Sequence, residues 1–198
     1  MIVEVGFLLN KPFKYYHELL LKQGAINTFN CETRDIYWSN RSFDGLAECQ
    51  IKAACIRYRC VKGLNQKEYP EIGHFQNYHI FNSAHDNSFP CLNYRFPLYE
   101  YIFQQSGWQK VFDTTKTDFQ YQIGNMKSRI QLQNISGIGL VLYYDNPDLY
   151  HLDKREQRKA LIDELNAYGF EFTYETLGID KLRSLHTGDL CYSDNQAG

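Results

Sequence analysis

Cysteine and histidine can ligate transition metals or act as nucleophiles, so their spacing is the first question. The six cysteines form no C-x-x-C pair, the spacing typical of zinc and thiol–disulfide sites. His74, His79 and His85 cluster in a turn-rich segment, but they match no zinc signature. We therefore expect free, mostly packed thiols and no metal at these histidines, with a disulfide or metal role for the cysteines as the less favoured alternative.

Motifs for nucleotide binding and acyl transfer are missing. The sequence has no G-x-x-x-x-G-K-[ST], no G-x-G-x-x-G after a strand and no G-x-S-x-G. Gly137-Ile138-Gly139 lies between two candidate strands, which favours a hairpin turn. The 16 tyrosines and 13 phenylalanines could stack on bases. Aromatic residues on strands more often pack in a core, so we expect no nucleic-acid partner.

Length and charge narrow the class of protein further. The 198 residues predict one domain over residues 1–186 and a polar C-terminal tail over 187–198. The formal net charge of −2 gives no domain-wide basic surface for duplex nucleic acid. No apolar run approaches the ~20 residues of a membrane span, and Glu4 stands where a secretion signal would be basic. We expect a cytoplasmic protein with no membrane partner.

Residue alternation predicts the elements that would position a site. In residues 53–60, Arg57 and Arg59 share one face with Ala53 and Cys55. Comparable patterns predict strands over 2–9, 29–38, 78–83, 108–114, 119–123, 127–134 and 138–145. Helices are expected over 13–23, 97–105, 154–168 and 180–185, and turns or loops over 61–75 and 82–93. The fold class predicted is α+β: a closed or nearly closed antiparallel β-barrel, or tunnel, of about eight strands with helices packed outside.

Four segments, in this order, resemble motifs of the CYTH superfamily, which includes class IV adenylyl cyclases, thiamine triphosphatases and inorganic triphosphatases. Gly24-Ala25 with Arg34-Asp35-Ile36-Tyr37-Trp38 resembles "GA … RDxYYD", and Cys55-Ile56-Arg57-Tyr58-Arg59 resembles "LRIR". Residues 129–139 resemble the "RIxLDxVxGLG" hairpin, and residues 165–185 resemble "LxxLG … SYxxLL". The resemblance implies a β-tunnel that binds an organic triphosphate or polyphosphate, with basic side chains on the phosphates and inward carboxylates on Mg²⁺ or Mn²⁺.

The sequence departs from this pattern at most of the family's carboxylates. Glu4 and Asp35 are the two acids that remain at matching positions. The others are replaced: "ExExK" falls on Ile2, Glu4 and Gly6, "LD" on Leu132-Gln133, the closing "ExE" on Leu142 and Tyr144, and the acid after the aromatic pair on Ser39. Two-metal phosphoryl transfer of the family type is therefore not expected, although a weakened Mg²⁺ site remains an alternative.

The basic positions are better retained. The resemblance implies phosphate-binding roles for a set of five cations: Arg57, Arg59, Arg129, Lys116 and Lys127. The alternative is that each of these side chains faces solvent, as is usual for Arg and Lys on antiparallel strands. Glu4 is then either a solvent-facing residue or a partner for the arginines inside the tunnel.

These residues leave three alternative functions for the protein. The first is a CYTH-like tunnel protein that binds a nucleotide or another polyphosphate-bearing small molecule, with reduced or absent metal-dependent catalysis. The second is an active, divergent adenylyl cyclase or organic triphosphatase, acting on phosphoanhydrides with Mg²⁺ or Mn²⁺. The third is a non-enzymatic interaction protein on the same barrel. Retained arginines argue against the third, and lost carboxylates against the second.

Overall fold

The computed structural model describes residues 5–42, 55–64, 72–77, 87–123 and 128–175. These residues form nine strands: β1 (Val5–Leu9), β2 (Ile26–Ser39), β3 (Cys55–Gly63), β4 (Ile72–Asn77), β5 (Asn87–Leu92), β6 (Gln109–Ile123), β7 (Ser128–Ile135), β8 (Gly139–Asp145) and β9 (Phe172–Glu175). They make one sheet in the order β5-β4-β3-β2-β6-β7-β8-β1-β9, in which each neighbouring pair is antiparallel.

Three α-helices occur in the described residues: α1 (Phe13–Lys22), α3 (Phe96–Gln105) and α4 (Lys154–Ala167). Short 3-10 turns span Asn93–Arg95 and Pro147–Leu149. Helix α4 begins with a capping box. The Asp153 carboxylate accepts from the backbone N–H of Glu156, and the Glu156 carboxylate accepts from the backbone N–H of Asp153. Gly169 follows its end at a φ of 82°, a left-handed conformation that glycine adopts without steric cost. The α+β class is thus confirmed.

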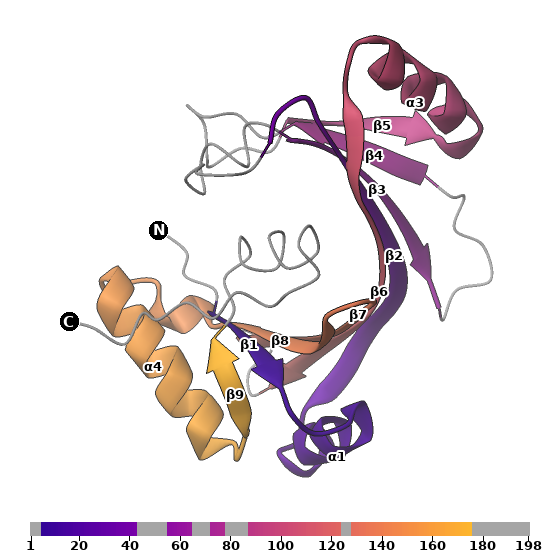
Figure 1. Ribbon diagram of the computed structural model, residues 1–198. Coiled ribbons are helices and arrows are strands. Elements are labelled where there is room, and N and C mark those ends of the chain that lie inside the picture. The colour runs from indigo at the N-terminus through magenta and orange to yellow at the C-terminus, as the bar shows by residue number, and fades with distance from the viewer. Residues whose placement is uncertain (1–4, 43–54, 65–71, 78–86, 124–127, 176–198) are drawn as a thin grey trace.

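The sheet bends into an arc, and the helices lie on its outer, convex side (Figure 1). The two longest strands, β2 and β6, pair along most of their length, with register shifts between Asn27 and Phe29 and between Tyr37 and Trp38. Such irregularities bend a sheet locally. Strands β5 and β9 are the edges, and no pairing joins them within the described residues. The predicted closed barrel of about eight strands is therefore not confirmed, because the described sheet is open.

Two apolar clusters attach the helices to the convex face. Leu132 and Leu142 of the sheet pack with Leu20 of α1 and Leu161 of α4. At the other end of the arc, Trp38 belongs to a second cluster, which includes Ile36, Tyr58, Phe96 and Phe103 and attaches α3. Because side chains alternate along a strand, the neighbours of these residues in sequence face the inner, concave side.

Several predicted boundaries were wrong. The segments 108–114 and 119–123 form one strand, β6, because its polar residues alternate between the two faces without breaking the ladder. Strand β4 begins inside the predicted turn segment 61–75 and extends two residues beyond it, and β5 lies within the predicted loop 82–93. Strand β9 was not predicted. The predicted strand 78–83 and helix 180–185 lie outside the described residues. The pairing of β1 with β8 confirms that these two segments belong to one sheet.

Candidate functional site

Register across the centre of the sheet brings the predicted acid and bases together. Asp35 of β2 lies opposite Arg59 of β3 and opposite Thr114 of β6. Two residues back along β2, Thr33 lies opposite Lys116. All of these positions alternate with residues that pack beneath the helices, so their side chains belong to the concave face.

Asp35 is the centre of this arrangement. Arg59 donates from Nε and Nη2 to its two carboxylate oxygens, at 2.6 and 2.8 Å, which is the bidentate geometry that the guanidinium favours. Lys116 Nζ lies 4.0 Å from Asp35 Oδ2 and 3.8 Å from Asp118 Oδ2. One buried carboxylate therefore serves two cations, and a second carboxylate shares the lysine.

Arg57 completes the group of cations. Arg57 lies opposite Tyr37. This pair is two residues along each strand from the Asp35–Arg59 pair, and the two pairs therefore share one face of the sheet. The Arg57 side chain donates to the Tyr37 hydroxyl at 3.5 Å, and its guanidinium carbon lies 5.9 Å from the centre of the Tyr37 ring. Arg57 is 8% exposed. We refer below to Arg57, Arg59, Lys116, Asp35 and Asp118 as the concave cluster.

The charges of the concave cluster perturb one another. Burial would raise the pKa of Asp35, but the hydrogen bonds and charge of Arg59, with the charges of Lys116 and Arg57, hold that pKa below the ordinary value of 3.8. Burial, with the nearby charge of Arg59, lowers the pKa of Lys116 below its ordinary value of 10.5 although two carboxylates oppose the shift. The cluster thus gathers three cationic side chains around two carboxylates.

Asp118 is a site residue that the sequence analysis missed. It accepts from Thr33 Oγ1 at 3.0 Å and from Gln131 Nε2 at 3.2 Å, in addition to its contact with Lys116. The available signal was the alternation Thr114, Lys116, Asp118. It was lost because the strand was divided between residues 114 and 119.

Arg129 lies apart from the concave cluster. Ile135, six residues after Arg129 on β7, lies opposite Lys116. Six residues of a strand span about 20 Å, so Arg129 and Lys116 are about that far apart along the strand direction. Arg129 donates to Asp145 at 2.9 Å, and its side chain is 64% exposed. Asp145 also accepts from the Tyr150 hydroxyl at 2.7 Å. A small hollow of about 130 Å³ lies beside Arg129. The structure thus brings Arg57, Arg59, Lys116 and Asp35 together, and no described contact joins Arg129 to them.

Two predicted site residues, Glu4 and Lys127, lie outside the described residues.

The structure also corrects the positions assigned to the closing carboxylate pair. Leu142 and Tyr144 are buried in the convex core, so their side chains could not have faced a ligand on the concave side. The concave positions of β8 are Val141, Tyr143 and Asp145, which means that this strand does supply one inner carboxylate.

The described donors do not form a divalent-metal site. Within the described ranges, no three side chains of His, Cys, Asp and Glu gather closely enough to hold an ion. Asp35, Asp118 and Asp145 each already contact a cationic side chain. A metal would have to displace these cations, so we derive no chemistry through one.

In the part of the chain that the structure describes, no helix is both long and apolar enough to cross a membrane.

The curved antiparallel sheet with outer helices defines the fold, and solved structures share it. No protein-family model and no curated protein sequence matches this chain. The PH1819 protein of Pyrococcus horikoshii OT3 superposes with a TM-score of 0.58 at 15% identity, covering 93% of this chain and 99% of that one.

Two further structures carry names that describe an activity. A candidate adenylate cyclase from Vibrio parahaemolyticus gives a TM-score of 0.55 at 9% identity, covering 92% of this chain and 97% of that one. HpAC1 from Hippeastrum is a candidate adenylyl cyclase described as having a dominant triphosphatase activity. It superposes with a TM-score of 0.54 at 12% identity, covering 96% of this chain and 98% of that one. These likenesses confirm the resemblance at the level of the fold.

Proposed function

We propose that the concave face binds the polyphosphate of a nucleotide or another small molecule. The observation that carries the proposal is the gathering of Arg57, Arg59 and Lys116 from two strands around Asp35. Bidentate arginines and a lysine are the side chains that proteins use to hold phosphate oxygens.

Burial of the cations is what distinguishes this cluster from an ordinary surface salt bridge. Lys116 is 7% exposed and Arg57 8%, and buried like charges are costly unless they are compensated. A polyphosphate brings several negative charges to the same face, so its binding offsets the repulsion among these three cations. An interaction protein that had lost its ligand would not need three cations gathered at this place.

The ligand class agrees with the structural neighbours. HpAC1 is described as a triphosphatase, so a protein with this fold acts on a triphosphate. We infer a similar ligand here, with reduced or absent metal-dependent catalysis, because the described carboxylates are engaged by cations. A divergent triphosphatase or adenylyl cyclase using Mg²⁺ or Mn²⁺ is the second candidate, and Asp118 favours it by adding a buried carboxylate beside Asp35 and Lys116.

Calorimetric titration tests the proposal. The protein is titrated with tripolyphosphate, ATP, thiamine triphosphate and a cyclic nucleotide, each with and without Mg²⁺ or Mn²⁺. We expect saturable binding of the three triphosphates without metal, and a cyclic nucleotide to bind at least about tenfold more weakly because it presents fewer phosphate charges. If no triphosphate binds, or if binding requires the metal, the proposal is wrong.

A further inference from the structure

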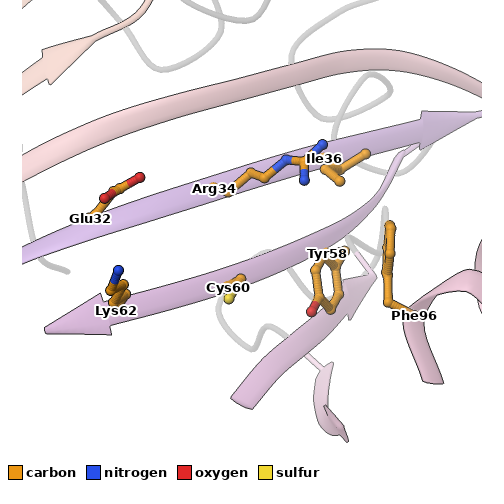
Figure 2. Close-up of a pocket in the computed structure, with 7 residues that line it drawn as sticks. All are labelled: Glu32, Arg34, Ile36, Tyr58, Cys60, Lys62 and Phe96. Atoms are coloured by element: carbon orange, nitrogen blue, oxygen red, sulfur yellow. The ribbon is translucent and has the colours of Figure 1, made fainter. Parts of the chain in front are cut away.

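Helix α3 has two apolar faces, of which the sheet uses one. Its inner face packs on the second apolar cluster of the convex side through Phe96, Tyr99 and Phe103. Figure 2 shows the Phe96 ring beside that of Tyr58, and the two rings stack with their centres 4.2 Å apart. These contacts fix the rotation of α3 about its own axis. The opposite face of the helix therefore points away from the sheet, at the end of the arc beside β5 (Figure 1).

The outer face of α3 carries a stripe of large apolar side chains that the fold leaves exposed. Leu98, Tyr101 and Ile102 recur at helical spacing, and Tyr94 precedes Leu98 by four residues. Their exposed fractions are 72% for Tyr94, 59% for Leu98, 59% for Tyr101 and 45% for Ile102. A helix that only covers a sheet normally has polar residues on its outer face. We refer to these four residues as the outer stripe.

The outer stripe is large enough to form an interface. Four side chains of this size, at these exposed fractions, present roughly 500 Å² of surface. Apolar patches of this size on a single chain commonly mark a binding surface. Two such patches packed together bury about 1,000 Å², which is the lower limit for a specific protein–protein interface. A second copy of the chain supplies a patch of matching size and apolar character.

The charges at the two ends of α3 also favour a second copy as the partner. Arg95 stands at the N-cap of the helix, where a cation is unfavourable because the helix dipole is positive there. Its guanidinium lies over the Tyr94 ring, 5.6 Å from the ring centre. The last turn of α3 contains no basic residue, although the C-terminal end of a helix attracts cations. When two copies of α3 pack antiparallel, Arg95 of each copy lies at the C-terminal end of the other.

From these features we propose that two copies of this chain associate through their outer stripes, with the two α3 helices packed antiparallel about a two-fold axis. Both copies contribute the same residues to such an interface, and each contact occurs twice. The outer stripes supply the buried area, and Arg95 sets the antiparallel direction. Pairing through the neighbouring edge strand β5 is opposed by Pro90, which has no N–H to donate. The interface lies on the helix side of the sheet and is independent of the function proposed for the concave cluster.

Sedimentation of the full chain over a range of concentrations tests the proposal. We expect a monomer–dimer equilibrium with a dissociation constant on the order of 10 µM, because an interface of this size is at the weak end. Ile102→Glu places an unpaired carboxylate in the interface twice and should weaken association at least about tenfold. Leu21→Glu is the matched control and should leave association unchanged, because Leu21 lies on α1 and is similarly exposed, at 49%. A chain that stays monomeric up to on the order of 1 mM, or equal weakening by the two substitutions, overturns the proposal.

An exchange of charges then tests the antiparallel direction. Arg95 and Gln105 are both exposed and lie about 15 Å apart along one helix, so they do not contact each other within one chain. Arg95→Glu should weaken association about tenfold, because it places a carboxylate at the C-terminal end of the second copy of α3. Gln105→Arg should also weaken association, because it sets two cations opposite each other. The double variant Arg95→Glu, Gln105→Arg should associate within about threefold of the wild type. If the double variant associates no better than Arg95→Glu, the proposal is wrong.

Discussion

Arg59 reaches the buried carboxylate of Asp35 through two hydrogen bonds while its own side chain stays partly open to the concave space. The side chain of Asp35 is 5% exposed and that of Arg59 is 28% exposed. Asp35 therefore fixes the position of the guanidinium at the edge of the concave space. An arginine held in this way loses little conformational entropy when it binds an anion.

Replacement of Asp35 by Asn should lower stability and raise anion affinity together. Removing one partner of a fully buried ion pair costs ~3–5 kcal/mol, and we expect a loss at or below the lower end because Arg59 is partly exposed. Tripolyphosphate should raise the melting temperature of Asp35→Asn more than that of the wild type, since the variant lacks the negative charge of Asp35 beside the cations. An anion that stabilises the two proteins equally would show that Asp35 does not hold a ligand-binding group.

The same substitution has a predictable pH dependence. The pKa of Asp35 is lowered below 3.8 in the folded state, so its contribution to stability is fully present above that value. The contribution is lost as the pH falls through the folded-state pKa, because the folded protein must then take up the proton that the unfolded chain already holds. The difference in unfolding free energy between wild type and Asp35→Asn should therefore be largest above pH 4 and shrink in stronger acid. Urea titrations across this range measure it.

Lys116 should take up protons when an anion binds. Its pKa is lowered below 10.5, so with rising pH it loses its charge earlier than an ordinary lysine, and folded-state stability rises in that interval because the cost of the buried charge is relieved. A bound polyphosphate raises this pKa again. Calorimetry in buffers of different ionisation enthalpy, above neutral pH, should detect proton uptake by the wild type. Lys116→Met should show only the uptake that the ligand itself causes; identical uptake by both proteins would contradict the prediction.

The position of Arg129 predicts a dependence on ligand length. Tripolyphosphate is much shorter than the ~20 Å that separates Arg129 from Lys116 along the strand. Arg129→Gln should therefore change tripolyphosphate affinity by less than about threefold, in the range of an exposed ion pair. Affinity for a long-chain polyphosphate should fall further in this variant, because a long chain can contact both Arg129 and Lys116. A large loss with tripolyphosphate would place Arg129 at the same site as Arg57.

Metal-dependent turnover should be low. Metal ions supply several kcal/mol of transition-state stabilisation, and each ~1.4 kcal/mol lost is a tenfold reduction in rate. We expect hydrolysis or cyclisation of ATP and tripolyphosphate to be slower than typical enzymes by a few orders of magnitude. Phosphate release and cyclic nucleotide formation are measured with Mg²⁺ and Mn²⁺. Turnover near ~1–10³ s⁻¹ would instead support the divergent enzyme.

The sequence located the central strands and the long helices because their apolar residues repeat with a clear period. Strands β5 and β9 were missed for physical reasons. Strand β5 is at the sheet edge and contains Pro90, and an edge strand tolerates a proline that a central strand would exclude. Strand β9 has four residues and lies at the other edge, which is too short for a period to show.

The candidate site was predicted in part. Alternation placed Arg57 and Arg59 on one face, and resemblance added Asp35 and Lys116, all of which lie in the concave cluster. Asp118 was missed because the strand was divided, and the match to Leu142 and Tyr144 was displaced by one position. A displacement of one residue moves a side chain to the other face of the sheet, so carboxylates counted from motifs alone are unreliable without the register.

Comparison of two arginine variants tests the central claim most directly. Arg57 belongs to the concave cluster and Arg34 lies on the convex face of the neighbouring strand, so Arg57→Met and Arg34→Met remove the same charge from opposite faces. Tripolyphosphate affinity is measured by calorimetry, and apo stability by urea unfolding. We predict that Arg57→Met weakens binding about ten- to a hundredfold and leaves the apo protein equally stable or slightly more stable, while Arg34→Met changes affinity less than about twofold. Equal affinities for the two variants, or strong destabilisation of apo Arg57→Met, would contradict a polyphosphate site on the concave face.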